Sequence, residues 1–256
     1  ILNSELLLFV SLLDYFSINH VIESGRARAQ STTIVSLWLK ANRGDCKFDS
    51  IEFDRNSPDN KIAVERIKKT NFTVNLLYGD SMNKIPQLLE ASKNDKISLL
   101  IDGPKGVDAV ILALNSLRNS NVKFVAVHDI HRDDAALRSI VELFPCTISS
   151  DNYNFVETYK YLDVSCWEEH QKYTQFHDWS PYKRGSRVMK SYGPTLFVIL
   201  NENISTADLK TIERKLNSLK QRRKLYSNFS KLIPNIIKNI PFVRKAQKIL
   251  VKAFKL

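Results

Sequence analysis

Between residues 20 and 130, short runs of β-branched and apolar residues alternate with longer segments whose apolar positions recur with a helical period. The predicted strands are His20–Ser24, Phe48–Phe53, Thr73–Tyr78, Ile97–Ile101 and Lys123–Val127. The predicted helices between them are Ser31–Lys40, Asp59–Lys69, Ile85–Ala91 and Val107–Arg118. This alternation is typical of βαβ units, in which each helix connects two parallel strands. It predicts an α/β fold: a Rossmann-like, doubly wound and mostly parallel sheet with helices on both faces.

After Asp129 the pattern predicts a helix at Ala135–Phe144, a β-like run at Phe155–Val164 and a strand at Thr195–Leu200. The 30 residues between the last two runs are rich in aromatic and charged side chains. A connection of that length inside a compact domain is often functional. A substrate lid and ordinary packing of its aromatic residues both remain open.

The chain changes character near residue 205. Leu209, Ile212, Leu216 and Leu219 recur at steps of three and four residues with Lys and Arg between them, which predicts an amphipathic helix. Pro234 and Pro241 are expected to break the remainder of the chain into short pieces. The sequence therefore divides into a Rossmann-like domain, residues 1–204, and a basic amphipathic helical extension, residues 205–256.

The net charge of +11 belongs to the extension. Residues 205–256 hold ten Lys and four Arg against two acidic residues, which leaves the first 204 residues close to neutral. A neutral core disfavours nucleic acid as a partner of the whole protein. The extension suits an anionic membrane surface or self-association, and a solvated tail is the alternative.

Two further observations bear on the compartment. The longest apolar run, Leu6 to Leu13, is far shorter than the roughly 20 residues that cross a bilayer, and no secretory leader is evident. Three widely separated cysteines have no metal-ligand spacing, which is typical of thiols in a reducing compartment. We expect a cytoplasmic protein that can lie peripherally at the inner face of a membrane.

The first predicted strand runs into a turn, Glu23-Ser24-Gly25, that opens the next helix near Ser31. Such a turn brings a ligand close to the backbone and to the free N–H groups of a helix N-terminus. Ala27 and Arg28 stand where a dinucleotide fingerprint needs glycine, which disfavours NAD.

The ends of the later strands also carry polar residues. Glu52 closes the second strand, where a carboxylate can accept hydrogen bonds from both hydroxyls of a ribose, and Asp54 is its rival for that role. The remaining strand ends read Gly79-Asp80-Ser81 followed by Ile85-Pro86-Gln87-Leu88, then Asp102-Gly103-Pro104-Lys105, then His128-Asp129.

Taken in order, these motifs resemble the catechol O-methyltransferase-like branch of the class I S-adenosylmethionine-dependent methyltransferases. The resemblance covers residues 20–130 and rests on an E-x-G turn, an I-E dipeptide, a G-x-S turn before I-P-Q-L, and D-x-x-K. It implies S-adenosylmethionine as cofactor and an antiparallel strand at the end of the sheet. It further implies a cofactor site made of Glu23, Gly25 and Ser31 at the methionine end, Glu52 at the ribose, Asp80 and Ser81 beside the adenine, and Asp102 beneath the sulfonium.

The resemblance also implies catalytic roles for Lys105 and Asp102. Lys105 matches a lysine that acts as a base, which requires that burial or neighbouring cations lower its pKa. In metal-dependent relatives Asp102 binds a divalent cation. Here Asp129 is the second carboxylate, and His131 or Asp133 would complete a set of ligands for Mg²⁺ or another divalent cation.

The sequence departs from the family at two places. Ala29 replaces a usual glycine in the first turn, which narrows the room for the cofactor, and Ile130 replaces the usual asparagine after the second metal carboxylate. The plainer alternatives also stay open. Glu23 and Glu52 would then cap helices or pair with Arg26 and Arg55, Asp102 would form a turn, and His128 and His131 would be ordinary loop histidines.

We therefore expect in-line methyl transfer from S-adenosylmethionine to a hydroxyl of a saccharide, a lipid-linked glycan or a small metabolite. Two alternatives belong to other classes: a non-catalytic Rossmann-like binding module in surface-polysaccharide assembly, and an RNA methyltransferase. Binding of S-adenosylhomocysteine separates the first from a methyltransferase, and salt-dependent RNA binding marks the second.

Overall fold

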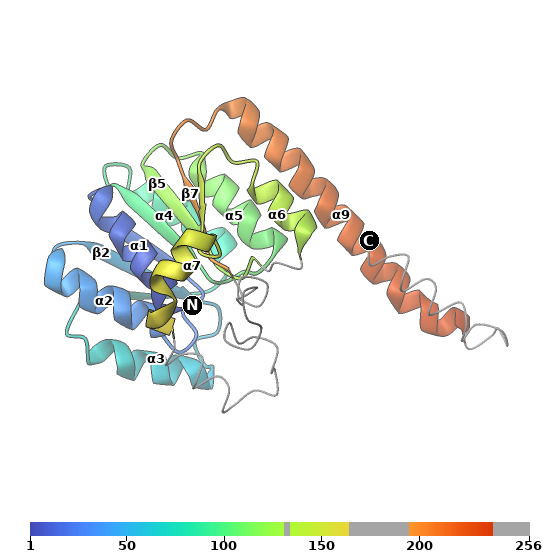
Figure 1. The fold of residues 1–256 in the computed structure, drawn as a ribbon. Coiled ribbons are helices and arrows are strands. Elements are labelled where there is room, and N and C mark those ends of the chain that lie inside the picture. The colour runs from blue at the N-terminus through green and yellow to red at the C-terminus, as the bar shows by residue number, and fades with distance from the viewer. Residues whose placement is uncertain (131–133, 164–194, 238–256) are drawn as a thin grey trace. The chain divides into compact units, whose positions relative to one another are not determined.

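The computed structural model describes residues 1–130, 134–163 and 195–237, with side chains in the last stretch described as far as Lys224. Its centre is a seven-stranded sheet of order β3-β2-β1-β4-β5-β7-β6 (Figure 1). All pairs from β3 to β5 are parallel, and β7 lies antiparallel to both β5 and β6. The strands are β1 His20–Ser24, β2 Lys47–Glu52, β3 Asn75–Tyr78, β4 Ile97–Ile101, β5 Val122–Val127, β6 Thr147–Ser149 and β7 Phe197–Leu200. The predicted Rossmann-like, mostly parallel sheet is confirmed. The antiparallel strand, β7, is the last strand along the chain, but it lies between β5 and β6 instead of at the edge of the sheet.

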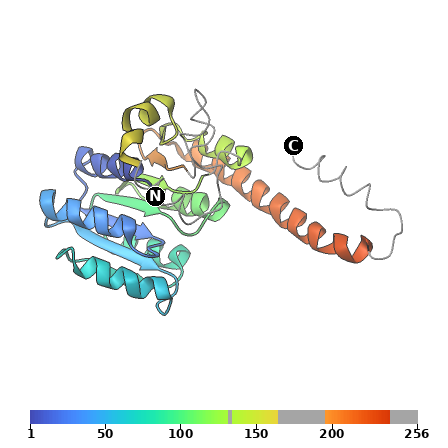
Figure 2. The same cartoon turned by 60° about the horizontal axis from the view of Figure 1, so that its bottom comes forward.

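Helices cover both faces of the sheet. They are α1 Asn3–Tyr15, α2 Gln30–Asn42, α3 Pro58–Lys68, α4 Ser81–Ala91, α5 Val107–Leu117, α6 Ala135–Val141 and α7 Tyr153–Tyr159. Figure 2 shows α1, α2 and α3 side by side, in blue to cyan. Because successive strand residues point to opposite faces, Val21 joins the core cluster beneath α1 and α2, whereas Ile22 is buried on the other face. Burial on both faces explains why the central strands are nearly continuous apolar runs.

One predicted strand is wrong. Of the run Phe155–Val164, the described residues 155–163 fold as the end of α7 and a 3-10 helix, η1, at Lys160–Asp163. The side chain of Asn152 caps α7 by accepting a hydrogen bond from the N–H of Asn154 at 3.1 Å. Phe155 and Tyr159, four residues apart, then stack on one side of the helix with their ring centroids 5.0 Å apart. The cap and this pair favour a helix in spite of the aromatic and β-branched composition.

The pattern also missed two elements. The apolar run near the N-terminus forms α1, whose Leu6, Phe9 and Leu13 are fully buried. The three-residue strand β6 is too short to show an alternation, and pairing with β7 defines it.

The helix α9 spans Thr206–Ile237. The chain clusters into two compact units, residues 1–216 and 217–256. Ile212 and Leu216, on the first part of α9, are buried in the first unit. The predicted division at residue 205 remains a prediction. Among the described residues, no helix is both long and apolar enough to span a membrane.

The expected interruption of this helix at Pro234 is wrong, because α9 continues to Ile237. Pro234 lies in the last turn of the helix. Pro241, the other predicted break, lies outside the described residues.

Candidate functional site

The turns after β1, β3 and β4 meet at the carboxyl edge of the sheet. The Ser24 hydroxyl donates to the Ser81 hydroxyl at 2.6 Å, and the Asp102 N–H donates to the Ser24 carbonyl at 2.7 Å. A methyl group on Gly25 would lie 2.5 Å from the Gly103 nitrogen. Glycine at position 25 thus permits a contact between the two turns that no other residue would allow.

The turn between β1 and α2 is wound unusually tightly. Gly25, Ala27 and Ala29 all have positive φ, at 88°, 43° and 60°. Ala29 is the N-cap of α2 and makes no side-chain capping bond. The first N–H groups of α2 therefore remain available to an anionic group, as the sequence predicts for the methionine end of a cofactor.

Glu23 lies beneath this turn and is fully buried. Its carboxylate accepts hydrogen bonds from the hydroxyls of Ser31 at 2.5 Å, Thr32 at 2.5 Å and Ser50 at 2.6 Å. Burial raises the pKa of Glu23 above its usual value, and the three hydroxyls offset part of that rise. Glu23 and Ser31 are thus bonded to each other and fix the start of α2.

Glu52 lies at the end of β2, half-buried beside the same turn. One oxygen accepts from the N–H of Ala27 at 2.7 Å and the other from the N–H of Phe53 at 2.9 Å. Each oxygen retains a second lone pair, so the carboxylate can still accept two hydroxyl groups. The Phe53 ring next to it is 76% exposed.

Arg26 points beneath the turn. Its guanidinium donates to the Ser50 carbonyl at 2.6 Å and to the Asn60 side chain at 2.8 Å, and it lies over the Tyr78 ring. The side chain is 2% exposed. Burial lowers the pKa of Arg26, although a guanidinium stays charged at any working pH. These bonds hold Arg26 against β2 and α3.

Asp80 and Ser81 begin α4. The Asp80 carboxylate caps the helix by accepting from the N–H of Met82 at 2.9 Å, and Ser81 bonds to Ser24. Both residues therefore sit on the strand end next to Glu52, since β3 pairs with β2. Their predicted place beside an adenine stays a prediction.

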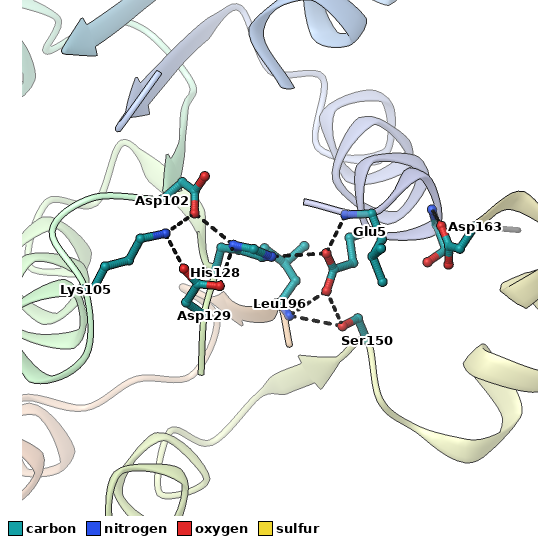
Figure 3. A network of polar contacts seen from close by, with 10 residues as sticks. Glu5, Asp102, Lys105, His128, Asp129, Ser150, Asp163 and Leu196 are labelled. Atoms are coloured by element: carbon teal, nitrogen blue, oxygen red, sulfur yellow. Dashed lines mark hydrogen bonds and ion pairs between the residues drawn. The ribbon is translucent and has the colours of Figure 1, made fainter. Parts of the chain in front are cut away.

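A second group of side chains lies at the ends of β4 and β5 (Figure 3). The Lys105 ammonium forms ion pairs with the carboxylates of both Asp102 and Asp129. His128 Nδ1 lies 2.8 Å from Asp102 Oδ1 and 3.2 Å from Asp129 Oδ1. Asp129 has a φ of 63°, a left-handed conformation that aspartate tolerates better than most residues. This strained turn aims both Asp129 and His128 at Asp102.

Behind His128 lies Glu5 of α1, which is fully buried. Its Oε2 is 3.3 Å from His128 Nε2 and accepts from the N–H of Leu2. Its Oε1 accepts from the Leu196 N–H at 2.9 Å and from the Ser150 hydroxyl at 2.8 Å. The imidazole is therefore held between a carboxylate from α1 and the pair of carboxylates at the sheet edge.

The pKa values in this cluster follow from the alternation of charge. Burial would lower the pKa of His128, but its hydrogen bonds to Asp102 and Glu5 raise it to about 9. Burial would raise the pKa of Glu5 and Asp102, but His128 outweighs it and holds both below their usual values. Burial would lower the pKa of Lys105, whereas Asp102 and Asp129 raise it. At neutral pH the cluster holds three carboxylates, one imidazolium and one ammonium.

The donor set can be tested against a divalent cation. Asp102, His128 and Asp129 each offer one ligand atom within 4.8 Å of the others. The two carboxylates suit Mg²⁺ or Mn²⁺, but a cation between them would take the position of the Lys105 ammonium. His128 would also have to lose a proton to become a ligand. His131 and Asp133, the other predicted ligands, lie outside the described residues, as does the aromatic run at 165–194.

The predicted site residues thus fall into two neighbouring groups. Gly25, Ser31 and Glu52 surround the turn after β1, with Glu23 beneath them and Asp80 and Ser81 alongside. Asp102, Lys105 and Asp129 form the second group. The sequence reasoning gave no role to Glu5, and it treated His128 as a possible loop histidine. The only sequence signal for His128 was its position next to Asp129 at the end of a strand.

The antiparallel pairing of β7 with β5 agrees with the antiparallel strand that the sequence resemblance implies. The described core has a Rossmann-like α/β fold. No protein-family model matches the sequence, and no curated protein matches it. Solved structures with a similar backbone include the O-methyltransferase TomG from Streptomyces achromogenes in complex with S-adenosylmethionine, at 16% identity, 77% of this chain, 78% of that chain and a TM-score of 0.43. Another is the O-methyltransferase from Bacillus cereus in complex with S-adenosylhomocysteine, at 14% identity, 78% of this chain, 82% of that chain and a TM-score of 0.46.

Proposed function

We propose that this protein is an S-adenosylmethionine-dependent methyltransferase that acts on an oxygen nucleophile. The observation that carries the proposal is the position of Glu52. Its carboxylate stands beside the Gly25 turn with one lone pair spare on each oxygen. An acidic side chain at the end of the second strand can hold both hydroxyls of a ribose.

The rest of the cofactor would follow the sheet edge. The uncapped N-terminus of α2 supplies N–H groups for the carboxylate of the methionine moiety. Asp102, joined to the Gly25 turn through the backbone, would lie beneath the sulfonium. With its three carboxylates and two cations, the cluster around Asp102 carries a net charge of −1 at neutral pH. That charge complements a sulfonium and offers nothing to the neutral sulfur of the product.

When bound, S-adenosylmethionine supplies an electrophilic methyl group. The residues of the chain would hold the acceptor oxygen in line with that methyl group, which accounts for much of the rate of such reactions. Lys105 would bind an acceptor hydroxyl as an ammonium. It could act as a base only after leaving the two carboxylates that raise its pKa. A divalent cation held by Asp102 and Asp129 would displace the Lys105 ammonium and would lower the pKa of the acceptor hydroxyl in its place.

The acceptor is proposed to be a hydroxyl of a saccharide, a lipid-linked glycan or a small metabolite. The near-neutral charge of residues 1–204 supports an uncharged or weakly charged acceptor over a nucleic acid.

Calorimetry with S-adenosylhomocysteine tests the cofactor. We expect Glu52→Gln to weaken binding about tenfold to a hundredfold, because hydrogen bonds to a charged group are worth about 1.5–3 kcal/mol. Asp54→Asn is the matched control: Asp54 lies two residues away, and its carboxylate accepts from the N–H of Asn56. Absence of binding at millimolar ligand, or an equal loss in the Asp54 variant, would contradict the proposal.

The second unit suggests where the enzyme works. Residues 217–256 contain eight Lys, three Arg and no acidic residue, together with many Leu, Ile and Phe. The side chains of Lys220, Arg222, Arg223 and Lys224 on α9 are exposed. Cationic amphipathic helices of this kind adsorb to anionic lipid. We propose that this unit places a cytoplasmic enzyme on an anionic membrane surface.

A further inference from the structure

The buried carboxylate of Glu5 contributes to the charge of the cluster around Asp102, but it has no role of its own in the chemistry described above. Glu5 lies on α1, outside the strand ends that carry the motifs. It is 0% exposed and has partners on both oxygens. A fully buried carboxylate is costly unless it is paired and hydrogen bonded. The cation that pairs with it is His128.

His128 lies between Glu5 and Asp102 and contacts each of them through a different ring nitrogen. Its Nε2 faces Glu5 Oε2 at 3.3 Å, and its Nδ1 faces Asp102 Oδ1 at 2.8 Å. The two ring nitrogens point to opposite sides of the imidazole, so a bond at one of them orients the other. Figure 3 shows the resulting row, which runs from Glu5 through His128 to Asp102.

Glu5 is itself held rigidly. The N–H of Leu196 at the start of β7 and the hydroxyl of Ser150 after β6 bind the same oxygen, at 2.9 Å and 2.8 Å. The N–H of Leu2 binds the other oxygen at 2.8 Å. Glu5 therefore cannot swing to follow His128, and the imidazole must adapt to Glu5.

We propose that Glu5 is a positioning residue that acts through His128 to fix the Asp102 carboxylate beneath the sulfonium. The inference rests on the proposed function, because it assigns Asp102 to that place. Asp102 also pairs with Lys105, but the Lys105 side chain is half-exposed and therefore less restrained than a buried one. The Glu5–His128 pair is the buried, immobile restraint on the same oxygen.

The two forms of the cofactor provide a selective test. S-adenosylmethionine carries the sulfonium charge, whereas S-adenosylhomocysteine is neutral at sulfur and otherwise makes the same contacts. Calorimetry of the full chain gives the ratio of the two dissociation constants. We expect Glu5→Gln to weaken binding of S-adenosylmethionine about tenfold and to change binding of S-adenosylhomocysteine less than twofold. A merely structural role for Glu5 would weaken both equally and overturn the inference.

Two further variants complete the test. Asp102→Asn should show the same selective loss, and adding Glu5→Gln to it should cause no further loss, because the two residues act in series. His128→Gln interrupts the row without touching the bonds of Glu5 to Leu196 and Ser150, so it serves if Glu5→Gln does not fold. Additive losses in the double variant would contradict the inference, as would an unchanged ratio in His128→Gln.

Asn3→Ala is the matched control on the same turn of α1. Asn3 donates to the Leu162 carbonyl at 3.0 Å and does not belong to the row. The ratio of the two dissociation constants in Asn3→Ala should equal that of the unmodified protein. A selective loss of S-adenosylmethionine binding in this variant would count against Glu5 as the positioning residue. If the unmodified protein binds neither ligand, the proposed function fails rather than this inference.

Discussion

At the residue scale, Glu23 and Glu5 show two ways of burying a carboxylate. Burial raises the pKa of Glu23, because the hydrogen bonds from three hydroxyls offset only part of the lost solvation. Glu5 faces an imidazolium, and its pKa is lowered. The first arrangement suits a structural support that need not hold a charge, and the second suits a row of fixed charges.

The raised pKa of His128 predicts how stability depends on pH. An imidazole at about 9 in the folded protein and 6.5 when unfolded contributes stability that is complete below pH 6.5 and lost as pH rises through 9. The groups that face it are Glu5, Asp102 and Asp129. We expect the free energy of unfolding to fall by about 3 kcal/mol across that range.

Urea unfolding at several pH values, with a chelator present, measures this fall. His128→Gln removes the titrating imidazole, so the fall in the free energy of unfolding as pH rises towards 9 should be smaller in this variant than in the unmodified protein. A flat profile in the unmodified protein would show that His128 is not held between carboxylates.

The sequence predicted single residues of this site only where a motif placed them. Glu52, Asp102 and Lys105 follow strand ends, so their convergence follows from the topology of a parallel sheet. Glu5 lies 191 residues from Leu196, its backbone partner. No local pattern encodes such a pair, because it depends on how α1 packs on the finished sheet.

At the element scale, the contact between the turns after β1 and β4 governs the site. A methyl group on Gly25 would lie 2.5 Å from the Gly103 nitrogen and 2.7 Å from the Asp102 carbonyl carbon. Gly25→Ala should therefore separate the two turns. We expect a loss of about 1–3 kcal/mol in the free energy of unfolding and loss of S-adenosylhomocysteine binding.

Gly44 provides the comparison, because a methyl group there would meet nothing within 4 Å. Gly44→Ala should leave both denaturant unfolding and calorimetry essentially unchanged. Normal ligand binding in Gly25→Ala would mean that the close approach of these turns is not needed.

Periodicity predicted the parallel core almost residue for residue, since β1 and β4 begin and end at the predicted residues. It failed at α7, where the capping side chain of Asn152 decided between helix and strand. It also failed at β6, which exists through pairing with β7. Short elements at the rim of a sheet depend on their neighbours more than on their own composition.

At the scale of the whole molecule, the net positive charge lies in a different part of the chain from the candidate site. Residues 1–204 are nearly neutral, and the positive charge lies in the rest of the chain. If the second unit binds anionic lipid, changing Lys220, Arg222, Arg223 and Lys224 together to Gln should weaken binding to vesicles by up to about a thousandfold, at about 1 kcal/mol per residue.

Sedimentation with vesicles of phosphatidylglycerol and phosphatidylcholine, compared with pure phosphatidylcholine, measures the effect. The control is a variant in which Lys61 and Lys68 of α3, and Lys69 directly after it, are changed to Gln. These side chains are exposed and belong to the first unit. Equal binding to neutral vesicles, or tighter binding to RNA than to the anionic vesicles, would refute the lipid proposal.

The bonds of Glu5 have a consequence for how the protein is made. During synthesis Glu5 emerges before Ser150 and Leu196, which come 145 and 191 residues later. Until β7 pairs with the sheet, the Glu5 carboxylate is not held by the Leu196 N–H and the Ser150 hydroxyl. His128 then has no fixed carboxylate to pair with. Affinity for the cofactor should therefore appear only in the last step of folding. Cofactor binding would then measure the fraction of molecules that have folded completely.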